Sequence, residues 1–199
     1  MQLCQKSDGD ALTVAVTLTP PLSDEDVAQL KAGDRVFITG TIFTARDAAH
    51  RRLVELIQKG QELPVDLAGQ VIYYVGPTPA QPGMATGSAG PTTSSRMDPY
   101  TPALLAATGL KALIGKGERS EEVAEALREH KAVYLAAVGG AGALLAGKIE
   151  SAQPVAWPEL GTEAMHRFEV KEFPAIVIID VHGGNLYRTG RSAYRRSAT

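Results

Sequence analysis

The sequence of 199 residues contains a single cysteine, Cys4. One cysteine cannot form a disulfide within the chain, and it cannot supply the several thiolates of a cysteine-rich metal or iron–sulfur site. No apolar run approaches the roughly 20 residues that cross a membrane, and the first residues lack the basic and then apolar pattern of a secretory signal. We therefore expect a cytoplasmic protein with no membrane role and no metal site of its own.

Neither sign of charge dominates the chain. It carries 20 Lys and Arg against 22 Asp and Glu, with a net charge of −2. Nucleic-acid-binding domains usually have a basic excess, so no nucleic-acid partner is expected. The length and the 44% hydrophobic content predict one domain over residues 1–199, with a core of about residues 10–188 and a tail at 189–199.

Nucleotide-binding motifs are also missing. A P-loop requires a glycine five residues before Gly115 and a Ser or Thr after Lys116, but the nearest glycine is Gly109 and Gly117 follows the lysine. The dinucleotide fingerprint fails at the run 140–145, where a leucine stands in place of the third glycine. Residues 139–142 are therefore expected to serve close packing, or a helix start near a ligand.

The histidines predict no catalytic triad. The four are scattered, and none has a partner spaced to activate a nucleophile. We expect His130 at a helix end, His166 on the surface and His182 in a turn. His50 alone is four residues from a candidate ligand residue, Arg46, which places both on one helix face; a solvated charged face is the alternative.

Strand-like and helix-like segments alternate along the chain, which indicates an α/β fold. Strands are expected at 13–19, 35–44, 70–75, 111–114, 132–138 and 175–180, and helices after Ser23, from about residue 45, over 101–108 and after Ser120. The first helix should end near Gly33. A polar segment is expected at 157–170, and a frayed basic tail from Arg188 onward.

A long segment rich in Gly, Pro, Ser and Thr runs from Gly76 to Pro102. Loops of this length are usually functional or disordered, and the non-repetitive order of this one favours an ordered functional loop. Glycines let backbone amides approach an anion, and an arginine fork binds a carboxylate. The stretch 87–98 is therefore predicted to bind an anion.

Three cations follow strands or lie in this loop: Arg46, Arg96 and Lys116. Together with Thr92 and Thr93, they would suit a small dicarboxylate if they converge on one cleft. The alternative is that each cation lies separately on the surface, where Lys and Arg are common.

Four sequence strings resemble one known family. They are Gly76-Pro77 through Gly83, Gly87-Ser88-Ala89-Gly90-Pro91-Thr92-Thr93-Ser94-Ser95-Arg96-Met97-Asp98, Gly115-Lys116-Gly117, and Phe173-Pro174-Ala175 with Asp180. They look like the β subunit, or C-terminal domain, of the class I iron–sulfur fumarases and L-tartrate dehydratases, over about residues 10–188. The resemblance implies a swivelling-type β/β/α domain with a mixed sheet flanked by helices. It also implies a heterodimer with a cysteine-bearing α subunit, which would bind the [4Fe–4S] cluster.

The same resemblance assigns roles to individual residues. It places substrate binding on Arg46, Gly90, Thr92, Thr93, Arg96 and Lys116, and catalysis on Thr92, Thr93 and Lys116, with no metal ligand in this chain. Thr92 is expected to act as a base together with a carboxylate of the partner subunit, because a lone threonine hydroxyl is a weak base.

The implied reaction is the reversible hydration of fumarate to malate, a hydro-lyase step of the tricarboxylic acid cycle. A tartrate dehydratase β subunit and a stand-alone domain that binds small dicarboxylates are the alternatives.

Overall fold

The computed structural model describes residues 15–194, with side chains up to residue 190. Cys4 and the start of the first expected strand, Thr13 and Val14, lie outside the described residues. Within 15–194, no helix is both long and apolar enough to cross a membrane.

Five parallel strands form the first part of the sheet. They are β1 (Val16–Leu18), β2 (Arg35–Thr44), β3 (Val71–Tyr73), β4 (Ala112–Gly115) and β5 (Val133–Ala136), and they lie side by side in sequence order. β3 and β4 are buried along their whole length, as is typical of parallel strands covered on both faces. The expected strands at 35–44, 70–75, 111–114 and 132–138 are thereby confirmed.

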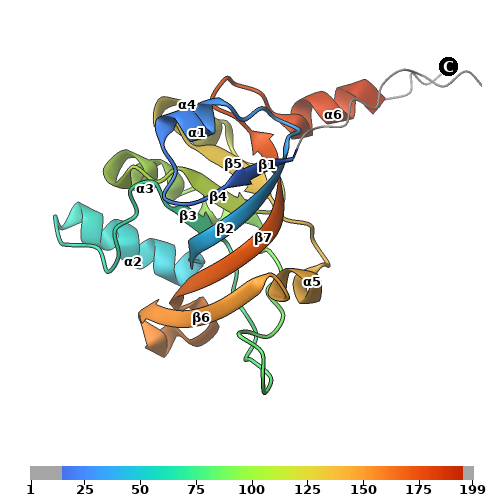
Figure 1. Ribbon diagram of the computed structural model, residues 1–199. Helices are drawn as coiled ribbons and strands as arrows, with labels where there is room; N and C mark the ends of the chain where they lie inside the picture. Colours follow the sequence, from blue (N-terminus) through green and yellow to red (C-terminus); the bar gives the residue numbers. More distant parts are fainter. Residues whose placement is uncertain (1–14, 195–199) are drawn as a thin grey trace, which may run out of the picture.

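Two antiparallel strands complete this sheet, and the second of them closes it. β6 (Ile149–Ala156) pairs with β7 (Met165–Ile179), and β7 pairs with both β5 and β2. The strands β2, β3, β4, β5 and β7 therefore form a closed ring, around which the long β7 curves (Figure 1). The expected mixed sheet with flanking helices is confirmed.

The expected polar segment at 157–170 is partly wrong. Residues 165–170 belong to β7, where buried and more exposed residues alternate approximately from Met165 to Val170, as they do in a strand with one covered face. Only the short 3₁₀ helix η2 (Pro158–Glu163) interrupts the pair of strands.

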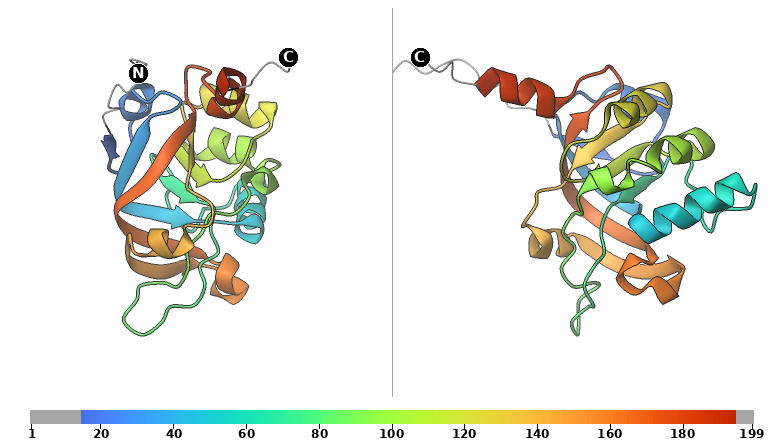
Figure 2. Two further views of the ribbon diagram at one scale, coloured as in Figure 1. Left: turned by 90° about the vertical axis from the view of Figure 1, so that its right-hand side faces the viewer. Right: turned by 180° about the vertical axis from the view of Figure 1, so that it is seen from behind.

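Three helices cover the outer face of the parallel strands. They are α2 (Asp47–Gln58), α3 (Thr101–Thr108) and α4 (Glu121–Glu129), and Figure 2 shows them together on one side of the sheet. α2 and α4 have an apolar stripe that is buried against the strands, with Leu53 and Leu127 fully covered. α3 ends at Gly109, in the left-handed conformation that glycine favours.

The remaining helices lie at the ends of the sheet. α1 (Asp24–Ala28) begins after Ser23, as expected, and Ser23 caps it, because the Ser23 hydroxyl accepts from the Asp26 amide at 3.1 Å. It ends at Ala28 and not near Gly33. The short α5 (Gly142–Ala146) follows β5. α6 (Leu186–Tyr194) replaces the frayed tail that was expected from Arg188.

Two hydrophobic cores lie on the two faces of the ring. Alternate residues of β3 divide between them: Val71 and Tyr73 face the interior of the ring, and Ile72 packs under the helices, as the two-residue period of a strand requires. The Tyr73 hydroxyl also donates to the Ala89 carbonyl at 2.6 Å. The long loop is thus fastened to the barrel interior.

Candidate functional site

The candidate residues come together at one edge of the sheet. β2 to β5 are parallel neighbours, so their carboxyl ends share an edge, where α/β proteins bind ligands. Arg46 follows β2, the loop that begins at Gly76 follows β3, and Lys116 follows β4 directly. Arg46, the loop and Lys116 therefore reach this edge at the ends of three different strands.

Backbone contacts fix the threonines at the edge. The Thr92 amide donates to the Tyr74 carbonyl at 2.7 Å, and the Ser94 amide donates to the Lys116 carbonyl at 2.9 Å. Thr93 forms an isolated β-bridge with Lys116. The loop is therefore paired with the ends of β3 and β4, with the Thr93 side chain exposed and that of Thr92 partly covered.

Arg46 and Arg96 meet at one carboxylate. Arg96 lies in the 3₁₀ helix η1 (Ser94–Met97), and its Nε donates to Asp47 Oδ1 at 2.8 Å. Arg46 Nη2 lies 3.8 Å from Asp47 Oδ2 and 3.4 Å from Glu163 Oε1. For this pair, the alternative of separate surface cations is wrong.

Lys116 joins the same edge through its backbone, and its side chain is exposed. A Cβ atom built on Gly139 would lie 3.7 Å from Lys116 Cδ. The lysine therefore extends beside the segment that follows β5.

Gly90 packs directly against α5. A Cβ atom on Gly142 would lie 2.3 Å from Ser88 Oγ and 3.0 Å from the Gly90 nitrogen, distances that no side chain could occupy without displacing the loop. The Ala89 amide also donates to the Gly142 carbonyl at 3.1 Å. The expectation of close packing at residues 139–142 is confirmed at Gly142.

His50 is buried behind Arg46 rather than beside it on a solvated face. Arg46 caps α2, and His50 Nδ1 donates to the Arg46 carbonyl at 2.9 Å. The imidazole contacts the rings of Tyr74 and Tyr100, with centroids at 5.2 and 6.3 Å. Burial lowers the pKa of His50 to about 4, so the ring is neutral near pH 7.

Three of the four buried polar side-chain atoms that lack a hydrogen-bond partner among the described residues gather at the start of α2. They are Arg46 Nε, Asp47 Oδ2 and His50 Nε2. Such atoms are uncommon in protein interiors, and each one requires an explanation. Their position next to Arg96 marks this turn as a candidate for ligand contact.

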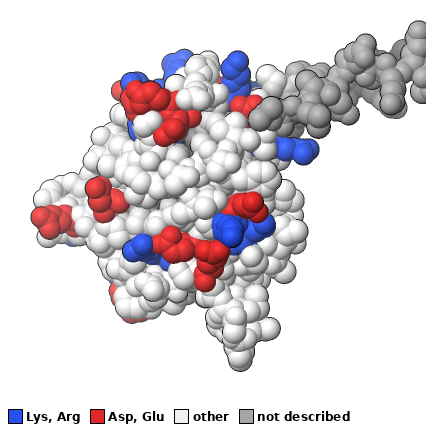
Figure 3. All heavy atoms as spheres, in the orientation of Figure 1, with Lys and Arg blue, Asp and Glu red and all other residues white. Residues whose placement is uncertain are grey.

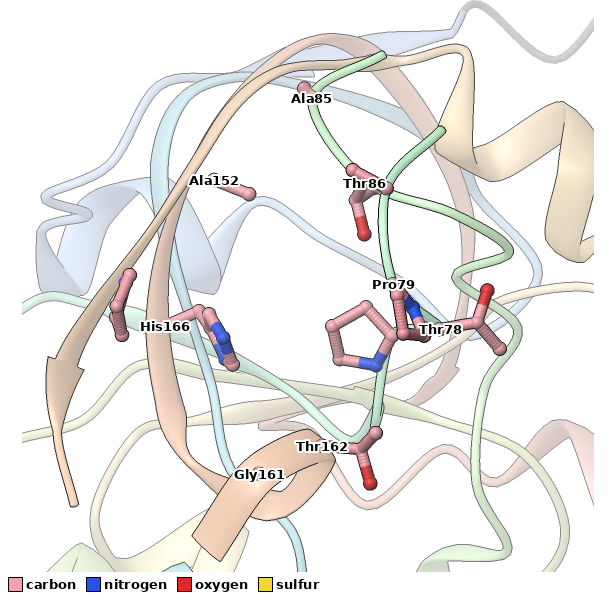
Figure 4. Close-up of a pocket in the computed structure, with 11 residues that line it drawn as sticks. Thr78, Pro79, Ala85, Thr86, Ala152, Gly161, Thr162 and His166 are labelled. Carbon is pink, nitrogen blue, oxygen red and sulfur yellow. The ribbon is translucent and has the colours of Figure 1, made fainter. Parts of the chain in front are cut away.

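A pocket of about 310 Å³ lies next to this turn, between the loop and the segment η2–β7. Figure 4 shows Pro79, Thr86 and His166 around its opening. None of the residues predicted to bind substrate or to act in catalysis lines it. Gly76 is close to both Arg46 and the lining residue Thr162: a Cβ atom built on it would be 2.8 Å from Arg46 Nη1 and 2.9 Å from the Thr162 carbonyl oxygen.

His166 is partly exposed, in line with the expected surface position, but it lines the wall of this pocket. Its ring is half-buried in this pocket, with Nδ1 3.0 Å from the Ala164 carbonyl, and burial lowers its pKa. His130 and His182 lie at a helix end and in a turn, as expected.

Three charged residues at this edge were missed from the sequence. Asp47 and Glu163 pair with the arginines, and Arg119 is buried against Asp98. Asp47 is adjacent to Arg46 in a first helical turn, a position that favours acids, and this signal could have drawn attention to it. Nothing in the local sequence distinguishes Arg119 from an exposed arginine.

The part of the chain from residue 15 to 194 contains no group of three or more His, Cys, Asp or Glu residues that could hold a metal ion. The candidate residues predicted for the carboxyl edge are cations and threonine hydroxyls, and the carboxylates of Asp47 and Glu163 are paired with the arginines; none is a cysteine thiolate, the usual ligand of a cluster iron. They therefore do not fit an iron–sulfur cluster as its ligands.

Comparison with known proteins identifies the family. Residues 2–190 match the family model described as Fumarase C-terminus. The chain belongs to this family.

Two relatives illustrate the range of the family. The chain is 39% identical over 190 residues to the anaerobic class I fumarate hydratase of Escherichia coli, an alignment that covers 94% of the chain and 34% of the relative. It is also 39% identical over 171 residues to a Methanocaldococcus jannaschii protein named as an L(+)-tartrate dehydratase β subunit. This alignment covers 83% of the chain and 88% of the relative. The chain spans about a third of the length of the class I fumarate hydratases that it matches.

Proposed function

We propose that this chain is the dicarboxylate-binding part of a hydro-lyase that hydrates fumarate to malate reversibly. The observation that carries the proposal is the meeting of Arg46 and Arg96 at Asp47, on the edge where Lys116 and the two threonines also lie. The similarity to class I fumarate hydratases supports the reaction type. The chain would act as one domain, with its core at about residues 10–188.

The arginines and the lysine would have different roles in substrate binding. Arginine presents a planar fork that fits a carboxylate and fixes its orientation. Arg96 is half exposed and holds Asp47 by a single Nε contact, so its terminal nitrogens can bind a ligand carboxylate. Lys116 would place a compact charge next to the carboxylate on which negative charge develops during proton removal. The Gly90 backbone would pack along the substrate.

The two threonines would take part in proton transfer and in orienting the substrate. Thr92 and Thr93 are held by backbone pairing at the ends of β3 and β4, so their main chains have fixed positions relative to Lys116. A threonine hydroxyl needs an activating base, and we assign that base to a carboxylate of the partner subunit. Thr92 then relays a proton, and Thr93 orients the reacting carbon atoms.

The partner in this proposal is a cysteine-bearing α subunit that forms a heterodimer with this chain in the cytoplasm and holds the [4Fe–4S] cluster. When bound, such a cluster supplies a Lewis acid for the substrate hydroxyl. Exposed apolar side chains support a partner: Met84 lies in the loop that carries the site, Val138 follows β5, and Leu144 lies in α5. Residues 76–95 contain no charged side chain. In Figure 3 the largest groups of visible charged side chains contain both signs.

Tartrate dehydration is the second candidate. The Methanocaldococcus jannaschii relative supports it, because the match covers most of that β subunit and most of this chain. A stand-alone dicarboxylate-binding domain is the third candidate, and it requires only the cation cluster.

The test is to co-express the chain with its cysteine-bearing partner without oxygen, and to assay fumarate hydration and the dehydration of malate and tartrate. Fumarate and malate turnover by the complex, but by neither chain alone, supports the proposal. Turnover of tartrate alone moves the assignment to the second candidate. A complex that turns over none of these acids, with Arg96→Ala leaving succinate affinity unchanged, contradicts both.

A further inference from the structure

Arg119 is a buried charge next to the candidate site. It lies between β4 and α4, and its side chain is 0% exposed. The guanidinium lies between the rings of Tyr74 and Tyr134, at 5.4 and 5.1 Å from their centroids. Burying a charge is costly unless it is paired and hydrogen-bonded, so its contacts must offset that cost.

The three nitrogens of this guanidinium have separate partners. Nε donates to Asp98 Oδ1 at 2.6 Å, Nη2 donates to Thr101 Oγ1 at 2.7 Å, and Nη1 donates to the Tyr74 hydroxyl at 3.4 Å. Burial alone would lower the pKa of Arg119, but the neighbouring Tyr74 and the Asp98 carboxylate outweigh it and the pKa is raised. The group therefore stays charged.

Two of the three partners of Arg119 are connected to the segment that carries the candidate site residues. The Tyr74 carbonyl accepts from the Thr92 amide. Asp98 lies two residues after Arg96, and its second oxygen accepts from the Ser120 amide at 2.8 Å. The loop is thus tied at both ends of the segment that carries the threonines and Arg96.

Tyr134 extends this connection to Lys116. Its ring stacks on Arg119, while its hydroxyl bonds to Ser94 Oγ at 2.9 Å and to the Gly117 carbonyl at 2.9 Å. Ser94 follows Thr93, and Gly117 follows Lys116. One buried guanidinium and its two flanking tyrosines therefore contact all the chain segments that present the candidate hydroxyls, Arg96 and Lys116.

We propose that Arg119 is a positioning residue, which holds the segment 92–98 and Lys116 in register for the dicarboxylate without touching it. The inference rests on the proposed function for its catalytic consequence, but not for its effect on the loop. Lysine could not replace arginine, because a single ammonium cannot reach three partners in one plane and stack between two rings.

The test compares Arg119→Met and Arg119→Lys with Leu30→Ala, measured in the full chain and in the assembled complex. Leu30 is fully buried next to α1, before the start of β2, so its truncation lowers stability at the opposite edge of the sheet. It controls for a general loss of melting temperature.

Two readouts separate positioning from stability. Hydrogen exchange of the Thr92 and Ser94 amides should accelerate at least about tenfold in both Arg119 variants. In Leu30→Ala, compared at a similar loss of melting temperature, the exchange rate of these two amides should stay unchanged. In the complex, kcat should fall by about 100-fold, with a smaller change in KM, because misplacement of about 1 Å is enough for such a loss. Equal exchange and equal kcat in Arg119→Lys and Leu30→Ala overturn the proposal.

Failure of the proposed function and failure of the positioning role of Arg119 give different results. If the wild-type complex is inactive, the proposed function fails, and the exchange comparison alone decides whether Arg119 orders the loop. If Arg119→Met does not fold, Tyr134→Phe replaces it: this variant keeps the ring on the guanidinium but removes the hydroxyl between Ser94 and Gly117. It should accelerate exchange at Ser94, and unchanged exchange there contradicts the proposed link.

Discussion

His50 should make this protein sensitive to mild acid. The ring is fully buried in the first turn of α2, its pKa is lowered from 6.5 to about 4, and the cause is burial. Because the folded state favours the neutral ring, the unfolded state binds the additional proton below pH 6.5. Stability is therefore complete above that pH, and it is lost as the pH falls toward 4.

The two pKa values give the size of the loss. Between pH 7 and pH 5 the free energy of unfolding should fall by about 2 kcal/mol from this group alone, since one pKa unit corresponds to about 1.4 kcal/mol. The assay is urea unfolding at pH 7, 6 and 5, with wild type and His50→Leu compared at each pH. His166 also has a lowered pKa, so the wild-type curve alone does not isolate His50.

The difference between the two proteins isolates it. His50→Leu removes the titrating ring, so its stability should decline with acid by about 2 kcal/mol less than that of wild type between pH 7 and pH 5. If both proteins lose the same stability over this range, His50 is not the buried neutral ring that the structure places there.

Two further variants test the packing. Gly115→Ala should cost about 1–3 kcal/mol of stability, because its Cβ would lie 1.9 Å from Ser94 Oγ; thermal unfolding should show this, while Gly190→Ala, with no atom near its Cβ, should be neutral or stabilising. Ser23→Ala should cost about 1 kcal/mol through the lost cap of α1. Activity of the complex should be unaffected, and a large loss of activity in Ser23→Ala would contradict the separation of α1 from the site.

The parallel half of the fold could be predicted from the sequence, but the closed ring could not. β2 and β3 are rich in β-branched residues, β4 and β5 are short apolar runs, and glycines end α3 and follow β4. The closure depends on β7, which pairs with β5 on one side and with β2, from the distant N-terminal part of the chain, on the other. A local pattern cannot report such long-range pairing, and the alternation at 165–170 was hidden by its charged residues.

The candidate site was predictable where strand order determines position. Arg46 and Lys116 follow parallel strands, and therefore their meeting edge could be inferred. The roles of Asp47 and Arg119 depend on which side chains meet across the fold: one carboxylate accepts from Arg96, and one guanidinium is enclosed by two tyrosines. These contacts join residues about 15 to 50 positions apart in sequence, beyond the reach of helix or strand periodicity.

The most direct measurement compares Arg96→Ala with Arg167→Ala in the assembled complex. The two arginines are matched: their side chains are 50% and 52% exposed, and each has a carboxylate oxygen at 2.8 Å. If the carboxyl edge binds the substrate, Arg96→Ala should lower kcat/KM for fumarate by about 10- to 100-fold, the value of a charged hydrogen bond, while Arg167→Ala stays near wild type. Equal values for the two variants would contradict the assignment of this edge as the dicarboxylate site.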